Sequence, residues 1–286
     1  MSEQADARKM QLLEILAEAQ EPQEIEALAR KLRCDTRTIR RDLEQLESLL
    51  HSMQGIELKR GKVSAAREGF YSGYFGEQLQ RGTEAKEAIA RTVLTLLPEN
   101  SAIALTAGST NYTIAQHIKR AVIADCPPRN LIVFTNSLPV LQEMIVAHVS
   151  TGVLGEIFSE DDCAFHTPEF RSAFQPSIAI VGASGVLING AVNPATLDLF
   201  SHRAEEAAFL KQLLKGIPEI IIAVDSTKIG KRHPWSFGGS TLVGKSVCLV
   251  TDTLTPEQVT LLEGMPLRLK PQGIDFTYLV SKPKTP

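Results

Sequence analysis

The chain has 286 residues, of which 43% are hydrophobic, and a formal net charge of −3. This length allows a small module beside one larger domain, and the charge excludes a protein that binds polyanions through its overall charge. The four cysteines are scattered without paired spacing, which excludes a disulfide framework and a zinc site.

Two short helices are predicted at the start of the chain. The first begins near Asp6, and its apolar positions are Leu12, Leu13, Ile15 and Leu16. The apolar positions of the second are Ile25, Leu28, Ala29 and Leu32. Both sets recur at helical spacing. Only Arg33 and Cys34 separate the second helix from the next capping residue, so a tight turn must join them.

A third helix is predicted to start after Asp35, whose carboxylate can accept backbone N–H bonds there. Its apolar stripe consists of Ile39, Leu43, Leu46 and Leu50. At about 100° per residue, Arg37 and Arg41 point away from this stripe, and Arg40 lies beside them. A helix with one apolar and one arginine-rich face suits the DNA major groove, where arginine binds guanine edges or phosphates.

The surrounding sequence supports a helix-turn-helix. Between Arg30 and Arg41 there are six basic residues and one acidic residue. Such a run is most often a solvated helix face, but a capped helix that follows two short helices favours DNA binding. Farther on, residues 56–63 alternate in character and have Gly61 at a turn position, which predicts a basic β-hairpin wing. The residues expected to contact DNA are Thr36, Arg37, Thr38, Arg40, Arg41, Lys59, Arg60 and Lys62.

Residues 1–64 are therefore predicted to form a winged helix-turn-helix domain, and residues 65–83 a linker. The aromatic residues of this linker are Phe70, Tyr71, Tyr74 and Phe75. We expect them to dock on a neighbouring surface. A stacking platform for nucleic-acid bases is the alternative.

Strands and helices alternate over residues 84–286. Helices are predicted over 84–97 and 204–215, and the pattern Thr255-Pro256-Glu257-Gln258 predicts the start of another. Short apolar strands are predicted at 103–105, 131–134, 178–181, 220–224 and 247–250. The unbroken apolar character of 220–224 is typical of a strand buried on both faces. The fold class is thus an N-terminal winged helix-turn-helix plus an α/β domain with a mostly parallel sheet flanked by helices.

Four loops that follow predicted strands are rich in small, hydroxyl and amide side chains. In parallel sheets, ligands bind beyond the carboxyl ends of the strands, where N–H groups at a helix start suit an anion such as phosphate. Ordinary turns have the same composition, but the corresponding positions of these loops favour one site. Asp225 could accept sugar hydroxyls, and Lys228 could hold a phosphate. The residues expected to bind an effector are Ala107, Gly108, Ser109, Thr110, Asn136, Ser137, Gly182, Ala183, Ser184, Asp225 and Lys228.

With these residues in view, the chain resembles the DeoR family of bacterial transcriptional regulators over nearly its full length. Residues 38–43 (TIRRDL) are similar to the family's recognition-helix signature. The other similar segments are 105–110 (LTAGST), 135–138 (TNSL), 182–185 (GASG) and 225–230 (DSTKIG). Thr106 stands where the family motif has an aspartate.

The resemblance implies a sensor domain similar to ribose-5-phosphate isomerase, which binds a phosphorylated sugar or a related metabolite. It also implies a homo-oligomer that binds double-stranded operator DNA and commonly represses genes of carbohydrate metabolism. No Walker A or GxGxxG pattern occurs, and no cofactor or metal is expected.

Two other functions compete with this one. A sugar-phosphate isomerase fused to a DNA-binding domain would need a carboxylate base, yet the first loop has Thr106 there, so a non-enzymatic protein is expected. A sensor that has lost DNA binding fits poorly with the intact segment 38–43. The sequence shows no charged-then-apolar leader and no apolar run that could span a bilayer, so a cytoplasmic protein is expected.

Overall fold

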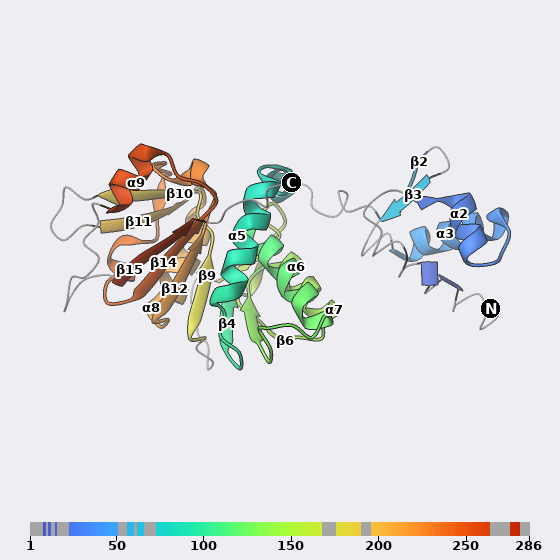
Figure 1. Cartoon of the computed structure of the whole chain (residues 1–286), viewed down its shortest axis with the longest axis horizontal. Coiled ribbons are helices and arrows are strands. Elements are labelled where there is room, and N and C mark those ends of the chain that lie inside the picture. Colours follow the sequence, from blue (N-terminus) through green and yellow to red (C-terminus); the bar gives the residue numbers. More distant parts are fainter. Residues whose placement is uncertain are drawn as a thin grey trace. The chain divides into compact units, whose positions relative to one another are not determined.

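A computed structural model describes residues 8–9, 11–12, 15, 23–50, 56–59, 62–65, 73–167, 176–189, 196–263 and 275–280. For residues 46–50, 56–59 and 62–65 only the backbone is described. The chain divides into two compact units, Met1–Ser72 and Gly73–Pro286, whose helices and strands are drawn in Figure 1.

The first unit contains a helix-turn-helix. Helix α2 (Ile25–Lys31) precedes helix α3 (Thr36–Leu50), and residues 8–9, 11–12 and 15 are also helical. The core consists of Leu12, Ile25, Leu28, Ala29, Ile39 and Leu43. All six come from the predicted apolar stripes, so the spacing that predicted these helices is confirmed. The side chains of Leu13, Leu16, Leu46 and Leu50 lie outside the described residues.

A tight turn joins α2 to α3. The Cys34 N–H donates to the Ala29 carbonyl at 3.0 Å, and the Arg33 N–H donates to the Arg30 carbonyl at 3.3 Å. This pair of bonds defines a Schellman motif, in which a glycine usually holds the left-handed position. Here Arg33 holds it with φ of 50°. A side chain in that conformation costs about 1–2 kcal/mol.

The predicted wing is present as an antiparallel hairpin. Strands β2 (Ile56–Lys59) and β3 (Lys62–Ala65) pair so that Lys59 lies opposite Lys62. A two-residue strand, β1 (Gln23–Glu24), adds to β3 and completes the order β1-β3-β2. Strand β1 was not predicted, because two residues are too few to show an alternating pattern.

The predicted linker over 65–83 is too long. Helix α4 (Gly73–Gln80) and the start of helix α5 (Thr83–Leu96) fall inside it, and both belong to the second unit. Phe75 is buried there, as expected for a docked aromatic residue. Phe70 and Tyr71 lie outside the described residues. The second unit therefore begins at Gly73, eleven residues before the predicted start at residue 84, because two glycines in α4 obscure its helical pattern.

A seven-stranded sheet forms the centre of the second unit, in the order β15-β14-β12-β9-β4-β5-β6. Every pair in it is parallel, which confirms the predicted fold class. The strands are β4 (Ala102–Leu105), β5 (Ile132–Thr135), β6 (Ser150–Val153), β9 (Ile178–Val181), β12 (Glu219–Ala223), β14 (Ser246–Thr251) and β15 (Asp275–Val280). The remaining α-helices are α6 (Ser109–Ile123), α7 (Leu138–Val146), α8 (Ala204–Lys215) and α9 (Pro256–Glu263).

Apolar cores lie on both faces of the sheet. Helices α5, α6 and α7 cover one face, where Ile178 and Ile180 of β9 join their core (Figure 1). The alternate residues Ala179 and Val181 join the second core, which includes residues of α8. Burial on both faces explains why these strands are unbroken apolar runs. None of the helices in the described part combines the length and apolar character needed to cross a bilayer.

Two small antiparallel sheets lie beside the central sheet and were not predicted. One consists of β10 (Gly185–Asn189), β11 (Thr196–Ser201) and β13 (Trp235–Ser236). The other consists of β7 (Ile157–Ser159) and β8 (Ala164–His166). The predicted capping box of α9 is confirmed, because Thr255 and Gln258 exchange hydrogen bonds of 2.9 and 3.2 Å.

Candidate nucleic-acid interface and effector cavity

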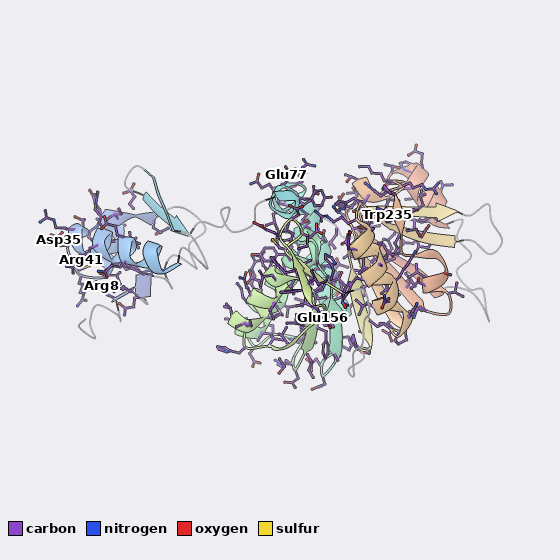
Figure 2. All side chains as sticks on the ribbon, turned by 180° about the vertical axis from the view of Figure 1, so that it is seen from behind. Arg8, Asp35, Arg41, Glu77, Glu156 and Trp235 are labelled. Atoms are coloured by element: carbon purple, nitrogen blue, oxygen red, sulfur yellow. The ribbon has the colours of Figure 1, made fainter. Side chains whose placement is uncertain are left out.

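Helix α3 presents its basic residues to solvent. Ile39 is buried in the core, whereas Arg37, Arg40 and Arg41 are exposed. The Asp35 carboxylate accepts the N–H of Arg37 at 2.6 Å, so it caps the helix as predicted. Figure 2 labels Asp35 and Arg41 on this unit. The helix thus has the apolar and cationic faces that major-groove binding requires.

The other predicted DNA contacts are less fully defined. Thr36 is exposed and Thr38 is half-buried. Lys59 and Lys62 stand opposite each other at the end of the hairpin. The side chains of both lysines and the whole of Arg60 lie outside the described residues. The role of all eight residues in binding DNA stays a prediction.

The buried side chain of Asp42 links α3 to an earlier helical segment. Its side chain is only 1% exposed, and it accepts a hydrogen bond from Arg8 Nε at 2.5 Å. This bond raises the pKa of the Arg8 guanidinium. Asp42 belongs to the TIRRDL segment, but no role was predicted for it. Asp42 is therefore a buried residue, and its ion pair with Arg8 links an earlier helical segment to α3.

A cavity of about 70 Å³ lies among the loops that follow β4, β9 and β12. Its volume lies below the range of about 300–1,000 Å³ that is typical of clefts holding drug-sized ligands. The predicted residues in its wall are Ala107, Gly108, Ser109, Thr110, Gly182, Ala183, Ser184 and Lys228. The wall also contains Tyr74, Phe75, Gln78, Asn111, Asp162, His202 and Glu206.

One set of wall groups suits an anion. Helix α6 starts in the wall with Gly108 at its N-cap, and no side chain caps it. The first N–H groups of a helix have no intrahelical partner, and the helix dipole favours negative charge there. Gly108 has φ of 129°, and a Cβ atom at this position would meet no atom within 4 Å. The glycine therefore supplies a backbone conformation that other residues rarely adopt. Lys228 adds a positive charge to the same wall.

A second set of wall groups has buried polar atoms without hydrogen-bond partners among the described residues. Asn111 is 0% exposed, and its Nδ2 donates to the carbonyls of Thr106 and Ile180, which fixes the amide orientation. Among the described atoms, Asn111 Oδ1, Asp162 Oδ2 and His202 Nε2 are buried and have no hydrogen-bond partner. Buried polar atoms rarely stay unpaired, so a bound molecule with hydroxyl groups, which both donate and accept, would satisfy them.

Burial shifts the pKa values of three titratable groups in the wall. It lowers the pKa of His202, whose Nδ1 lies 3.0 Å from Ser184 Oγ, so the imidazole is neutral at neutral pH. Burial also raises the pKa of Glu206, although a hydrogen bond from the Ser201 hydroxyl opposes this rise. The Tyr74 ring packs on His202 with centroids 4.2 Å apart, and burial raises the pKa of its phenol. In all three groups, burial therefore favours the neutral form.

Comparison with known proteins gives the family. A family model described as the DeoR C terminal sensor domain matches residues 81–253. The chain belongs to the DeoR family. A model of an HTH domain matches residues 8–70. This DeoR-family chain is therefore a transcriptional regulator that carries a helix-turn-helix domain and a sensor domain.

The curated relatives of this DeoR-family chain are transcriptional regulators, and the similarity covers most of the length of each. It is 26% identical to the HTH-type transcriptional repressor CsqR of Escherichia coli, over 87% of this chain and 88% of that protein. It is 25% identical to the glycerol-3-phosphate regulon repressor of Escherichia coli, over 82% of this chain and 86% of that protein. Among solved structures, ribose 5-phosphate isomerase from Plasmodium falciparum matches with a TM-score of 0.38 and 16% identity, over 51% of this chain and 52% of that one.

Three predicted effector residues of this DeoR-family chain do not line the cavity. Asn136 is buried, accepts the Ala107 N–H at 2.8 Å and donates to the Phe165 carbonyl at 3.0 Å. Ser137 caps α7 by accepting the Val140 N–H. Asp225 caps a short 3-10 helix and lies 3.7 Å from Lys228 Nζ. Asn136 therefore bonds to a wall residue, Asp225 lies beside one, and Ser137 is an internal cap of α7.

Thr106, which stands where the family motif has an aspartate, is also not a wall residue. Thr106 is buried, its hydroxyl donates to the Ile180 carbonyl at 3.3 Å, and Asn111 Nδ2 donates to this hydroxyl at 3.1 Å. Thr106 therefore contacts the wall residue Asn111 without lining the cavity itself.

Several wall residues of this DeoR-family chain were missed. Tyr74, Phe75 and Gln78 come from α4, which was predicted as linker. Asp162, His202 and Glu206 come from segments without a loop motif. No group of three or more metal-ligating side chains occurs in the part of the chain that the structure describes.

Proposed function

We propose that the protein is a transcriptional regulator of carbohydrate metabolism whose hold on operator DNA responds to a phosphorylated sugar or a similar metabolite. The observation that carries the proposal is the composition of the cavity wall. An uncapped helix start and Lys228 suit a phosphate, while Asn111 Oδ1 and His202 Nε2 suit hydroxyl groups, which both donate and accept. A polyhydroxylated phosphate is a small molecule that satisfies both sets.

The relatives support this class of regulon. One is named a glycerol-3-phosphate regulon repressor, and another, 28% identical over 69% of this chain, is named an L-fucose operon activator of Haemophilus influenzae. Two of the three relatives cited are repressors, so we propose repression as the mode. We also propose a homo-oligomer, as the resemblance implies, and a cytoplasmic location.

We further propose that the regulator has no enzymatic turnover. Sugar-phosphate isomerisation needs a carboxylate base, and the first loop has Thr106, whose hydroxyl donates to the Ile180 carbonyl, where the family motif has an aspartate. Turnover of ribose 5-phosphate that is lost on Glu206→Gln would contradict this part of the proposal.

DNA binding is tested with the double variant Arg40→Ala and Arg41→Ala in the full chain. Each specific arginine contact contributes about 1–3 kcal/mol, so affinity for DNA from upstream of the protein's own gene should fall by roughly 30-fold or more. Arg129→Ala, which removes a surface arginine of the second unit, is the matched control. Equal affinity in the double variant and the control would refute the proposed interface.

Effector binding is tested by thermal shift. Ribose 5-phosphate, fructose 6-phosphate and glycerol 3-phosphate are compared with the same compounds without phosphate. A ligand that binds only the native state stabilises it by about 2.7 kcal/mol at one hundred times its Kd. We expect stabilisation by a phosphorylated member that is lost in Lys228→Met. A panel in which phosphate makes no difference would contradict the proposed effector class.

A further inference from the structure

Helix α4 lies between the two family models yet forms part of the cavity. The HTH model ends at residue 70 and the sensor model begins at residue 81, whereas α4 spans Gly73–Gln80. It contributes Tyr74, Phe75 and Gln78 to the wall. Its first residue, Gly73, directly follows Ser72, which is the last residue of the DNA-binding unit. The wall of the cavity therefore includes the segment that leads to the DNA-binding unit.

The sequence of α4 makes it a weak helix. It has eight residues, fewer than the roughly 12–15 at which isolated helices become marginal in water. Gly73 and Gly76 lie within it, and an interior glycine costs up to about 1 kcal/mol relative to alanine. Its order must therefore come from contacts with the rest of the second unit.

The contacts of α4 include a residue of the cavity wall. Phe75 is 3% exposed, its N–H donates to the Asp161 carbonyl at 3.2 Å, and its ring meets Tyr112 edge-on at 6.1 Å. Tyr74 packs on the His202 ring at 4.2 Å. Glu77, in contrast, is 67% exposed and is labelled on α4 in Figure 2. One face of α4 thus contacts the residues that would touch an effector, and another is free of them.

Lys86 of α5 holds the end of α4. Its Nζ donates to the Gln78 carbonyl and, at 2.5 Å, to the Arg81 carbonyl. Burial and the charge of Lys228 lower the pKa of Lys86 to about 8. An anion beside Lys228 would reduce the repulsion between these two lysines and strengthen the charged form that binds the α4 carbonyls. The anion-binding groups and the α4 anchor are therefore electrostatically linked.

We propose that α4 reports occupancy of the cavity: an effector contacts Tyr74 and Gln78, fixes α4 in its docked position, and α4 transmits this state to the DNA-binding unit. The inference rests on the proposed function, since it takes the cavity as the effector site. A ligand shifts an equilibrium only by its differential affinity for the two states. Contact of the effector with Tyr74 and Gln78 supplies such a difference between docked and undocked α4, and the electrostatic link between Lys228 and Lys86 adds to it.

Hydrogen–deuterium exchange on the full chain tests this mechanism. The probes are ribose 5-phosphate, fructose 6-phosphate and glycerol 3-phosphate at saturating concentration, with their unphosphorylated forms as controls. A probe that slows exchange at residues 107–111 should slow it at residues 73–80 by roughly tenfold, within the usual range of coupling between sites. Glu77→Ala, on the exposed part of α4, should respond like the unmodified chain.

The double variant Tyr74→Ala and Gln78→Ala should lose the slowing at 73–80. If it does not fold, Lys86→Met, which removes the anchor but no wall residue, should show fast exchange at 73–80 with and without probe. Slowing at 107–111 without any at 73–80 in the unmodified chain overturns the inference and leaves the proposed function intact. Unchanged α4 slowing in the double variant also overturns it. No slowing at either segment overturns the proposed effector class and this inference with it.

Discussion

Replacing Asp42 by asparagine should loosen the recognition helix from within. The Asp42 side chain is 1% exposed, and Arg8 Nε lies 2.5 Å from its Oδ2. Removing the charge of one partner of a buried ion pair costs about 3–5 kcal/mol. The Arg8 side chain is 19% exposed, so water can solvate part of its charge once the pair is broken. We therefore expect a loss of about 2–3 kcal/mol from the free energy of unfolding of the first unit.

Hydrogen exchange of α3 amides in the full chain measures this loss. The single tryptophan, Trp235, lies in the second unit, so its fluorescence does not report on α3. At about 1.4 kcal/mol per factor of ten, protection of α3 should fall roughly 30- to 150-fold. Arg41→Ala, on the exposed face of the same helix, should change protection by less than about threefold, since such surface substitutions stay within about 0.5 kcal/mol. Equal protection in the Asp42 and Arg41 variants would refute the reasoning.

Three further predictions concern single sites. Arg33→Gly relieves the strain of the left-handed backbone at φ of 50°, whereas the greater chain entropy of glycine in the unfolded state opposes this gain. The free energy of unfolding of the first unit, measured with urea, should therefore rise by about 0.5–1 kcal/mol. A fall in this free energy would contradict the Schellman assignment. Asn136→Ala leaves the Ala107 N–H and the Phe165 carbonyl unpaired, which should lower the melting temperature of the second unit through a loss of about 2–4 kcal/mol. Because burial lowers the pKa of Lys86 from 10.5 to about 8, the folded state binds fewer protons than the unfolded state between these values. The unmodified chain should therefore gain about 3 kcal/mol relative to Lys86→Met as pH rises from 8 to 10.5, and a difference that does not change with pH would disprove the burial of a charged lysine.

The sequence predicted those features that depend on neighbours along the chain. The cap at Asp35 and the burial of Ile39 follow from local spacing, and the loops of the cavity follow from the rule that parallel strands end at one edge. Asp42 was not recognised as buried, because its partner Arg8 is 34 residues away. Nothing in a single sequence shows such a distant pairing.

Small polar residues were the second reason why the effector site could be predicted only in part. Ser109 and Ser137 each stand at the start of a helix after a strand, yet only Ser109 lines the cavity. Composition cannot separate a ligand contact from an internal cap, since both use the same hydroxyl chemistry. Helix α4 was missed for another reason: its glycines give it the composition of a linker, and only docking makes it a helix.

The weakness of α4 is also what a reporter element requires. Couplings between sites are typically about 1–3 kcal/mol, so an effector can switch only an equilibrium whose two states differ by a similar amount. The glycines of α4 and the buried charge of Lys86 both oppose the docked state, while Phe75 and the two carbonyl bonds of Lys86 favour it. Replacing Gly76 by alanine should therefore shift α4 toward the docked state by up to about 1 kcal/mol without any effector. In exchange measurements α4 would be slower in the absence of probe, and the additional slowing by probe would be smaller. A larger probe effect in Gly76→Ala would show that α4 is not balanced between two states.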